Sequence, residues 1–322
     1  MSVMTCSSRT LRHAAYLTAV ARSVGSAWRG TVQGVIGLFL LVALVVTGRY
    51  LAVSTHELRH EVHNLTREVR QLEKEQAMPA LVLNRYRNSI CYILGVYRVG
   101  FDGRPPAVRA RVSGSGFVVA DGLLATNRHI AEPWYKDSED AALLRKGARP
   151  HLEKLLAFFP GLPEAVKISM AGLSAEGDLA VLRMENSEAV RQLRPVPLAD
   201  RTPNAGELIS LVGYPMGVFG MVEKSPTTVY ERLAFRHDDQ VANELAALSL
   251  IRPSATFGHL GDVVVDKLIY DAPSAPGASG GPVFNSRGEV IAVNTAYVDG
   301  FAGGTLGLSV HALLPLIAKA AH

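Results

Sequence analysis

One short segment near the end of the chain, Gly277–Pro282 (GASGGP), limits the possible folds more than any other stretch. Pro276 before it favours a tight turn at Gly277, and the glycines around Ser279 leave the backbone open where a Cβ would crowd an approaching molecule. A serine presented in this way is typical of a nucleophile loop, in which backbone amides face a carbonyl group. The residues after Ser279 then indicate which fold carries the loop.

The pattern Gly-x-Ser-x-Gly also occurs at the strand-to-helix turn of α/β-hydrolases, where the serine opens a helix. Here Ser279 runs into Gly280–Pro282 and then Val283–Asn285, which predicts a strand instead of a helix. Only His311 and His322 lie downstream, and neither falls in a clear loop. The α/β-hydrolase alternative is therefore disfavoured.

Residues upstream supply the partners that a nucleophilic serine needs, which are a base to take its proton and a carboxylate to orient that base. Residues 114–119 and 123–126 predict two short strands around a tight turn, and the second strand leads to His129. Asp178 stands just before an apolar stretch with the pattern of a strand. His129 is the candidate base, and Asp178 is the candidate orienting group.

Three blocks in the order His, Asp, Ser resemble the catalytic blocks of trypsin-like serine proteases, and the nearest subgroup is the bacterial HtrA (Deg) type. The similarity covers roughly residues 88–317. It implies a mainly β fold of two six-stranded antiparallel barrels, the chymotrypsin-like architecture, with the protease domain at residues 82–322. The blocks are Thr126–His129, Gly177–Ala180 and Gly277–Pro282, and the similar linking segments are Ile209–Gly217, Asp271–Ala272 and Gly288–Thr295.

The resemblance implies a role for each member of the three blocks. Ser279 is the expected nucleophile, His129 the general base and then general acid, and Asp178 the group that orients His129. The amides of Gly277 and Ser279 are the expected oxyanion hole. Ala278 departs from the asparagine that is common in the HtrA type, but only its backbone borders the oxyanion site, so catalysis is expected to survive.

An insertion between the histidine and aspartate blocks is a second departure from the family. Its residues 150–159 predict a short helix over the rim of the active site. Long segments at 131–170 and 222–262 are able to act as lids over the cleft. The sequence therefore leaves two alternatives, a serine endopeptidase and a catalytically weak scaffold or sensor with the protease fold and a gated oxyanion loop.

The expected substrate pocket contains no acidic residue. A pocket for arginine or lysine needs a buried carboxylate, so the composition indicates cleavage after small or medium apolar residues. The resemblance implies protein or peptide substrates, namely envelope or misfolded proteins, and the sequence indicates no cofactor and no metal. The expected pocket residues are Ser274, Ala275, Asn294, Thr295 and Ala296, with Pro273 beside them.

The start of the chain has the pattern of a membrane anchor. Residues 1–30 contain arginines but no acid and form a basic leader, and residues 31–48 are an uncharged apolar run long enough to span a bilayer. The positive-inside tendency places the N-terminus in the cytoplasm and the protease domain outside it, in a bacterial periplasm or, as an alternative, the mitochondrial intermembrane space. A cleaved signal peptide and a mitochondrial presequence are the competing interpretations.

Residues 49–78 have heptad spacing and predict a coiled-coil stalk. β-Branched residues at one core position and leucine at the other favour a parallel dimer, whereas HtrA proteases generally form trimers, so we expect a homo-oligomer of undetermined number. Glu68 and Glu73 would repel across the seam. The core positions are Leu51, Leu58, Leu65 and Leu72, alternating with Thr55, Val62 and Val69.

The same stretch contains His56-Glu57-Leu58-Arg59-His60, which matches the zinc-protease pattern His-Glu-x-x-His. Both histidines fall on the outer side of the heptad, in a charged stretch without a third ligand at the usual spacing. The match is therefore attributed to the charged face of the stalk and not to a metal site.

Composition adds few further constraints. The 33 Lys and Arg against 29 Asp and Glu give a net charge of +4 that owes much to the leader, so it indicates membrane orientation and not nucleic-acid binding. Cys6 and Cys91 would lie on opposite sides of a membrane, and no disulfide within the chain is expected. After the last expected strand, a helix at 311–320 leaves no room for the PDZ domain that is usual in HtrA proteases.

Overall fold

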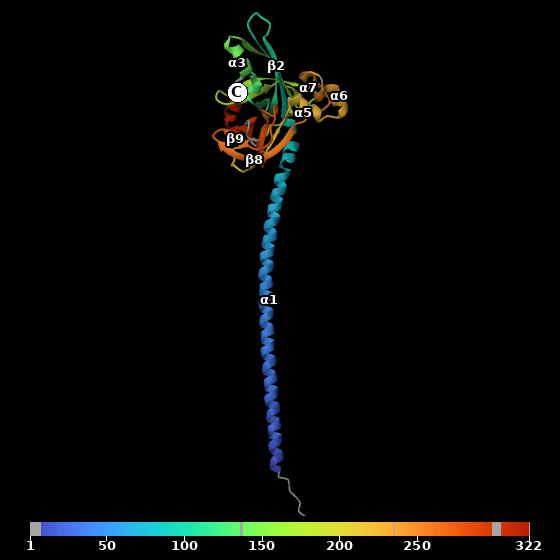
Figure 1. Cartoon of the computed structure of the whole chain (residues 1–322), viewed down its shortest axis with the longest axis vertical. Coiled ribbons are helices and arrows are strands. Elements are labelled where there is room, and N and C mark those ends of the chain that lie inside the picture. The colour runs from blue at the N-terminus through green and yellow to red at the C-terminus, as the bar shows by residue number, and fades with distance from the viewer. Residues whose placement is uncertain (1–7, 136–137, 235, 298–303, 322) are drawn as a thin grey trace, which may run out of the picture. The chain divides into compact units, whose positions relative to one another are not determined.

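The computed structural model describes residues 8–135, 138–234, 236–297 and 304–321, and it divides the chain into two units, residues 1–72 and residues 73–322 (Figure 1). In the second unit the described strands close into two barrels, with the strand orders β1-β2-β3-β6-β5-β4 and β10-β11-β12-β9-β8-β7. Every paired strand within them is antiparallel. The prediction of a mainly β fold with two six-stranded barrels is confirmed.

The first barrel is built around β1, which pairs with β2 on one side and β4 on the other. The expected hairpin of β2 and β3 is present, and its tight turn uses Gly122 with a positive φ of 71°. β3 then pairs with β6, so the chain leaving β3 lies beside the chain entering β6. The strands are β1 (Ile90–Gly100), β2 (Val108–Ala120), β3 (Leu123–Thr126), β4 (Arg149–Phe158), β5 (Val166–Leu173) and β6 (Ala180–Met184).

The helix expected at residues 150–159 is wrong, because this segment is the strand β4. Its side chains alternate between exposed and less exposed over the first part of the strand, which is the period of a strand and not of a helix. β4 forms a ladder with β1 from Tyr92↔Phe158 to Gly100↔Arg149. Pairing with the long edge of β1 outweighs the helical spacing of leucines that the isolated segment shows. A helix does occur earlier in the insertion, as α3 (Ser138–Arg145).

The second barrel carries the serine segment. Ser279 is followed by β10, as expected from its sequence, and β10 pairs with β7 and β11. The strand entry excludes the helix that an α/β-hydrolase turn would need. The strands are β7 (Leu208–Gly213), β8 (Ser254–Val264), β9 (Lys267–Tyr270), β10 (Pro282–Asn285), β11 (Val290–Tyr297) and β12 (Thr305–Ser309).

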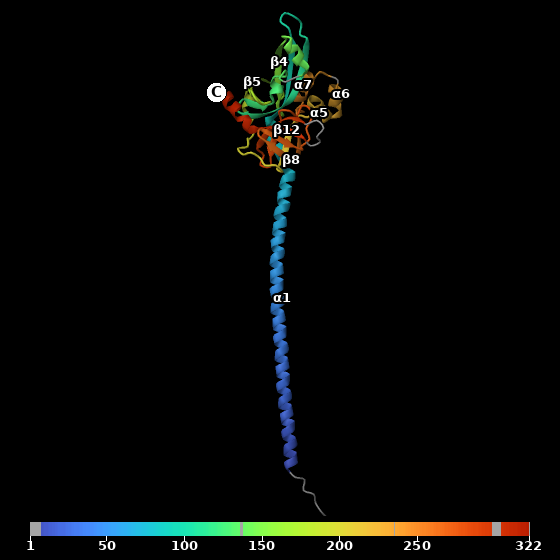
Figure 2. The same ribbon diagram turned by 60° about the vertical axis from the view of Figure 1, so that its left-hand side comes forward.

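Short helices fill the connections between the strands. Three of them, α5 (Gly217–Glu223), α6 (Thr227–Leu233) and α7 (Asp238–Ala247), lie between β7 and β8 and gather on one side of the barrels in both views (Figures 1 and 2). α7 is joined to β4 by an ion pair of Asp239 with Lys154, at 2.8 Å. The remaining helices of this unit are η1 (Arg87–Ser89), α2 (Arg128–Ala131), α4 (Glu188–Arg191), η2 (Val310–Ala312) and α8 (Leu314–Ala321), the last two covering the helix expected at 311–320.

One buried cluster joins the two barrels. It contains Phe117 and Phe158 from the first barrel and Phe284 from the second, together with Tyr92 and Tyr214, all almost completely buried. Tyr214 donates its hydroxyl hydrogen to the Ile90 carbonyl at 2.9 Å, across the barrels. Large aromatic side chains buried at such a junction stabilise it through their apolar area. The shared core therefore fixes the barrels against each other.

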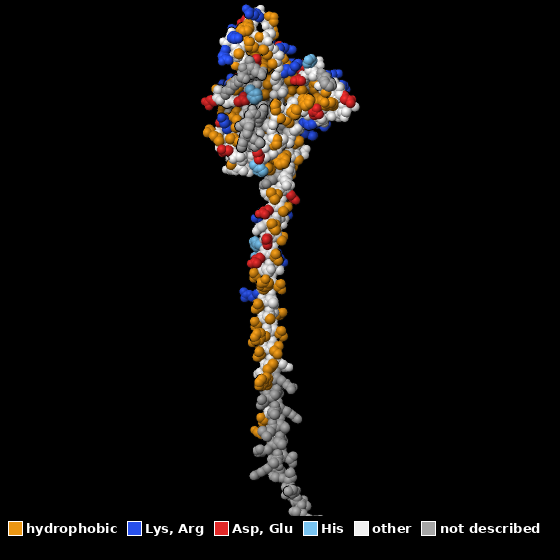
Figure 3. Space-filling view, in the orientation of Figure 1, with side chains coloured by type: hydrophobic (Ala, Val, Ile, Leu, Met, Phe, Trp, Pro, Cys, Tyr) orange, Lys and Arg blue, Asp and Glu red, His pale blue; other side chains and the backbone are white. Residues whose placement is uncertain are grey.

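In the first unit the described residues, 8–72, belong to helix α1 (Ser8–Tyr86), whose remaining residues, Pro79 among them, belong to the second unit. Within the described residues, one helical segment is apolar and long enough to cross a membrane, with a mean hydropathy of 2.2 in a window inside residues 31–73. Hydrophobic side chains cover this part of α1 (Figure 3), and Leu38, Phe39 and Leu44 are all more than half exposed. The heptad leucines are also exposed, and the described chain is a single copy, so the coiled coil stays a prediction.

Candidate active site

His129 and Asp178 meet at the mouth of the first barrel. His129 lies in α2, directly after β3, and Asp178 lies two residues before β6, so the pairing of Thr126 with Ala180 brings the two side chains together. His129 Nδ1 lies 2.6 Å from one carboxylate oxygen of Asp178, and the backbone amide of His129 donates to the other at 2.9 Å. Asn127 donates to the Asp178 carbonyl at 2.9 Å and fixes the backbone of this corner.

The electrostatics keep the Asp178 carboxylate ionised. Burial, the largest influence, raises the pKa of Asp178, but the hydrogen bonds from His129 and Thr295 and the charge of His129 outweigh it and hold the pKa below its ordinary value. An ionised carboxylate accepts hydrogen bonds only, so the proton between the groups belongs to His129 Nδ1. In the neutral ring, Nε2 of His129 is then the nitrogen with a free lone pair.

Thr295 connects Asp178 with Ser279. Its hydroxyl donates to the Asp178 carboxylate at 2.8 Å, and its carbonyl accepts the hydroxyl hydrogen of Ser279 at 3.2 Å. In the part of the chain that the structure describes, no hydrogen bond joins Ser279 to His129. The three predicted residues are thus linked through Thr295, and the hydroxyl of the half-buried Ser279 is directed to the Thr295 carbonyl.

The loop before Ser279 presents two free backbone donors. The amides of Gly277 and Ser279 donate to no acceptor among the described residues, whereas the amide of Ala278 donates to the Ala275 carbonyl at 3.0 Å. Gly277 has a positive φ of 92°, and a Cβ there would lie 2.6 Å from the Tyr214 carbonyl oxygen. Only glycine fits this position. The Ala278 side chain is buried, so the departure from asparagine does not change the surface of the cleft.

The carbonyl of Pro276 determines the orientation of the first free amide. Met216, in the turn after β7, donates its backbone N–H to this carbonyl at 2.6 Å. In a trans peptide the C=O and N–H point in opposite directions, so the Gly277 amide is turned away from Met216. A collapsed oxyanion loop would require this bond to break.

The predicted pocket residues divide into two groups. Ser274 and Ala275 are half-buried beside the loop, whereas Asn294 is fully buried and braces it. The side-chain NH₂ group of Asn294 donates to Ser274 Oγ at 3.2 Å and to the Ala278 carbonyl at 3.1 Å. Its side-chain oxygen accepts from the Tyr270 hydroxyl at 2.7 Å. Ala296 lies in β11, but its side chain is outside the described part of the chain. Sequence reasoning missed the bracing by Tyr270 and the Thr295 bond to Asp178, because neither leaves a local signal.

Across the described residues, no three His, Cys, Asp or Glu side chains are grouped as metal ligands would be. His56 and His60 have their rings 5.2 Å apart on the exposed face of α1. Cys91 is buried in the first barrel, where burial raises the pKa of its thiol far above the ordinary value, so it is not a reactive thiolate.

A comparison with known families gives a match to the trypsin-like peptidase domain over residues 114–293. The chain belongs to the trypsin-like peptidase family. Among its relatives are two named probable periplasmic serine endoprotease DegP-like, from Pseudomonas savastanoi pv. phaseolicola and Chlamydia trachomatis. The first is 28% identical over 198 residues, covering 61% of this chain and 31% of the relative. The second is 28% identical over 215 residues, covering 66% and 34%.

The family members that match are therefore HtrA/DegP-like, and the chain spans about a third of their length. Among solved structures, the serine endoprotease from Yersinia pestis has a TM-score of 0.49 at 19% identity, covering 75% of this chain and 66% of that one. Membership of the family rests on the domain match, and the two barrels described above have the architecture that the resemblance implied.

Proposed function

We propose that this protein is a membrane-anchored serine endopeptidase that cleaves exposed segments of envelope or misfolded proteins through an acyl-enzyme on Ser279. One observation carries the proposal, namely that Thr295 links the oriented pair of His129 and Asp178 to the loop that has two free amides at Gly277 and Ser279. Beside the nucleophile, acyl transfer uses a base with a fixed tautomer and a preformed pair of donors for the oxyanion.

In the first step, Ser279 Oγ turns from the Thr295 carbonyl to Nε2 of His129 and transfers its proton there while Oγ attacks the substrate carbonyl carbon. The carbonyl oxygen becomes an oxyanion and accepts hydrogen bonds from the Gly277 and Ser279 amides. Protonated His129 then gives its proton to the leaving amine as the C–N bond breaks. A water molecule, deprotonated by His129, attacks the ester, and the returned proton restores Ser279.

Each part of this site is expected to contribute a characteristic factor to the reaction rate. General acid–base catalysis by His129 contributes about 10²–10⁴ in rate, and one oxyanion-hole donor about 10²–10³. Asp178 remains charged and stabilises the imidazolium that forms on His129, since its pKa lies below the ordinary value. The proposed preference is for small or medium apolar residues, because none of the expected pocket residues is acidic.

A gated scaffold or sensor is the second candidate. The bond from Ser279 Oγ to the Thr295 carbonyl, instead of to His129, is the observation that favours it. The free Gly277 amide and the bond that holds the Pro276 carbonyl favour the enzyme. A measurement of the reactivity of Ser279 is therefore needed to distinguish the enzyme from the scaffold.

Labelling of the full chain in detergent with a fluorophosphonate probe tests the proposal. The parent should be labelled, Ser279→Ala and His129→Ala should not, and Ser286→Ala, which changes an exposed serine after β10, should be labelled like the parent. An unlabelled but folded parent would favour the scaffold. Peptides with alanine or valine before the cleaved bond should be cut faster than those with arginine, and the opposite order would contradict the proposed pocket.

The proposed anchor is the apolar part of α1, with the basic leader in the cytoplasm and the barrels in the periplasm. The periplasmic naming of the relatives supports this side of the membrane. The protein should stay in the membrane fraction after alkaline carbonate extraction. A Leu40→Arg and Leu41→Arg double variant should be released, because each charge at the centre of a span costs about 2.5–3.5 kcal/mol. Release of the parent would contradict the anchor.

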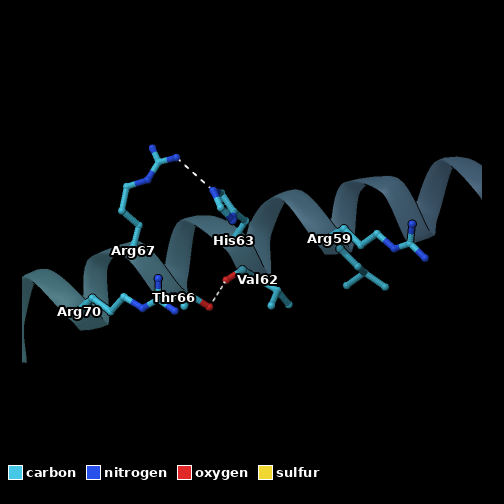
Figure 4. Close-up of a pocket in the computed structure, with 7 residues that line it drawn as sticks. Arg59, Val62, His63, Thr66, Arg67 and Arg70 are labelled. Atoms are coloured by element: carbon cyan, nitrogen blue, oxygen red, sulfur yellow. Dashed lines mark hydrogen bonds between the residues drawn. The ribbon is translucent and has the colours of Figure 1, made fainter.

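The proposed stalk pairs with further copies of the same chain. Leu58, Leu65 and Val62 are each more than half exposed in the single helix. Figure 4 shows Val62 among polar side chains, with Arg67 bonded to His63 at 3.2 Å. An apolar row flanked in this way is typical of a coiled-coil seam. Sedimentation in density-matched detergent gives the number of copies: two supports the heptad pattern, three the family tendency, and a monomer contradicts the stalk interface.

A further inference from the structure

Ser115 is a completely buried polar residue in β2, at the point where the first barrel meets the nucleophile loop. Its backbone amide donates to the Ser279 carbonyl at 2.7 Å, and its hydroxyl donates to the Gly277 carbonyl at 2.8 Å. The hydroxyl oxygen also accepts from the Tyr214 amide at 2.9 Å. The Ser115 carbonyl accepts the hydroxyl hydrogen of Thr126 at 2.8 Å. One residue of the first barrel thus holds two carbonyls of the loop in the second.

These two bonds complete a set that fixes every carbonyl from Pro276 to Ser279. The Pro276 carbonyl accepts from Met216, and the Ala278 carbonyl accepts from the Gly281 amide and the Asn294 side chain, each at 3.1 Å. The Gly277 and Ser279 carbonyls both accept from Ser115. Each N–H points opposite to the carbonyl of its own peptide unit, so the bonds of the Pro276 and Ala278 carbonyls orient the free Gly277 and Ser279 amides, and the two bonds from Ser115 hold the peptide units that follow them.

Backbone groups lie close around the Ser115 side chain and carbonyl. A Cβ at Gly213 would lie 2.8 Å from this oxygen, so the backbone of the β7 end is in close contact with it. At Gly280 a Cβ would lie 2.1 Å from the Ser115 carbonyl oxygen. The hydroxyl therefore has one donor and one acceptor partner, both backbone groups without access to water. Loss of the hydroxyl would leave the Gly277 carbonyl and the Tyr214 amide buried and unpaired.

We propose that Ser115 is a positioning residue that holds the oxyanion loop open through the Gly277 carbonyl, an inference that rests on the proposed function of that loop. Without its hydroxyl, the Gly277–Ala278 peptide unit gains by rotating its carbonyl toward another donor. Such a rotation moves the neighbouring Gly277 amide away from the position at which it meets an oxyanion. The residue acts on the rate of acylation and touches neither substrate nor the reacting atoms.

The test compares Ser115→Ala with Ser210→Ala in the full chain. Ser210 is an equally buried serine whose hydroxyl donates to the Thr256 carbonyl at 3.1 Å, inside the second barrel and away from the cleft. The rate of labelling by a fluorophosphonate is measured at increasing probe concentrations and normalised to the amount of folded protein. The data give a maximal rate constant and the probe concentration at which the rate is half-maximal. Ser115→Ala should lower the maximal rate constant about 10- to 1000-fold, as for loss of an oxyanion donor, with the half-maximal concentration nearly unchanged. Ser210→Ala should leave both values unchanged.

A second measurement, deuterium uptake, does not depend on the reaction of Ser279 with the probe. Deuterium uptake by the peptide covering residues 273–281 should rise in Ser115→Ala, because the bonds of the Ala278, Gly280 and Gly281 amides weaken when the loop rotates, and it should not rise in Ser210→Ala. A labelling rate within about threefold of the parent overturns the inference, as does unchanged uptake. If the parent itself is not labelled, the proposed function fails, and the uptake of residues 273–281 alone decides whether Ser115 holds the loop.

Discussion

Replacing Asp178 with asparagine changes one oxygen of the site to an NH₂ group and should remove nearly all activity. Three donors converge on the two carboxylate oxygens. The His129 amide donates to Oδ1 at 2.9 Å, and His129 Nδ1 and the Thr295 hydroxyl donate to Oδ2 at 2.6 and 2.8 Å. An asparagine side chain has one acceptor oxygen and one donor group, so it cannot satisfy all three donors.

The geometry indicates which orientation the asparagine adopts. With NH₂ at the Oδ1 position it would face the backbone N–H of His129, which cannot reverse its direction. With NH₂ at the Oδ2 position it faces a hydroxyl and a ring nitrogen, both of which are able to accept. The second orientation is favoured, and it leaves His129 Nδ1 without a proton. The ring then carries its hydrogen on Nε2, where it cannot take the proton of Ser279.

A misplaced tautomer lowers turnover by about 10⁴, which corresponds to about 5 kcal/mol in the activation free energy at 1.36 kcal/mol per tenfold. The assay is the rate constant of fluorophosphonate labelling, together with ¹⁵N NMR of the His129 ring. Asp239→Asn is the matched control, since it removes the same charge from the ion pair of α7 with Lys154 and should not change labelling. Activity within tenfold of the parent would refute the reasoning, and so would lost activity with the hydrogen still on Nδ1.

Three further predictions follow from single contacts. Gly277→Ala should reduce labelling at least about 100-fold, as loss of an oxyanion donor does, because φ is 92° and the new Cβ meets the Tyr214 carbonyl at 2.6 Å; unchanged labelling would show that the loop tolerates a side chain. Tyr214→Phe should lower the free energy of unfolding by about 1–3 kcal/mol in urea titration, because the buried Ile90 carbonyl loses its donor; a change too small to measure would exclude this bond as a brace between the barrels. The pKa of Asp178 is below its ordinary value when folded, so the ionised group stabilises the fold above about pH 4 and this contribution is lost as the pH falls through the folded pKa. Asp178→Asn should therefore lose less stability than the parent on acidification below about pH 4, and parallel curves would contradict the shift.

Local chemistry explains which parts of the fold could be predicted from the sequence. The β2–β3 hairpin and the strand after Ser279 were predictable because glycine, proline and short apolar alternation restrict the backbone within a few residues. The segment 150–159 was not, because its leucines repeat at helical spacing and only its ladder with β1 decides for a strand. The helices α5–α7 were likewise anticipated only as a long segment between strands.

In the candidate site, too, the residues in local motifs were predictable, whereas the contacts between residues distant in sequence were not. Glycine-rich and histidine-containing motifs indicated His129, Asp178 and Ser279 from their immediate neighbours. The bonds that hold them come from residues distant in sequence, such as Ser115 on Gly277 and Thr295 on Asp178. A buried serine in a strand carries no local sign that its hydroxyl crosses to another barrel. Such residues become visible only when the destination of each buried polar atom is known.

The magnitudes of the two rearrangements in the cleft favour the enzyme over the scaffold. Turning Ser279 Oγ from the Thr295 carbonyl to His129 exchanges one hydrogen bond for another, and a net bond is worth about 0.5–1.5 kcal/mol. That difference changes the reactive population by roughly tenfold at most, which is small beside the 10⁶-fold or greater accelerations of enzymes. Collapse of the oxyanion loop would instead break the bonds of the Pro276 carbonyl to Met216 and of the Gly277 carbonyl to Ser115, and the second of these bonds is made by a completely buried hydroxyl whose loss water does not replace. Under the proposed function, the loop that is costly to rebuild already has its Gly277 and Ser279 amides free, and the change that remains is the turn of the Ser279 hydroxyl from Thr295 to His129.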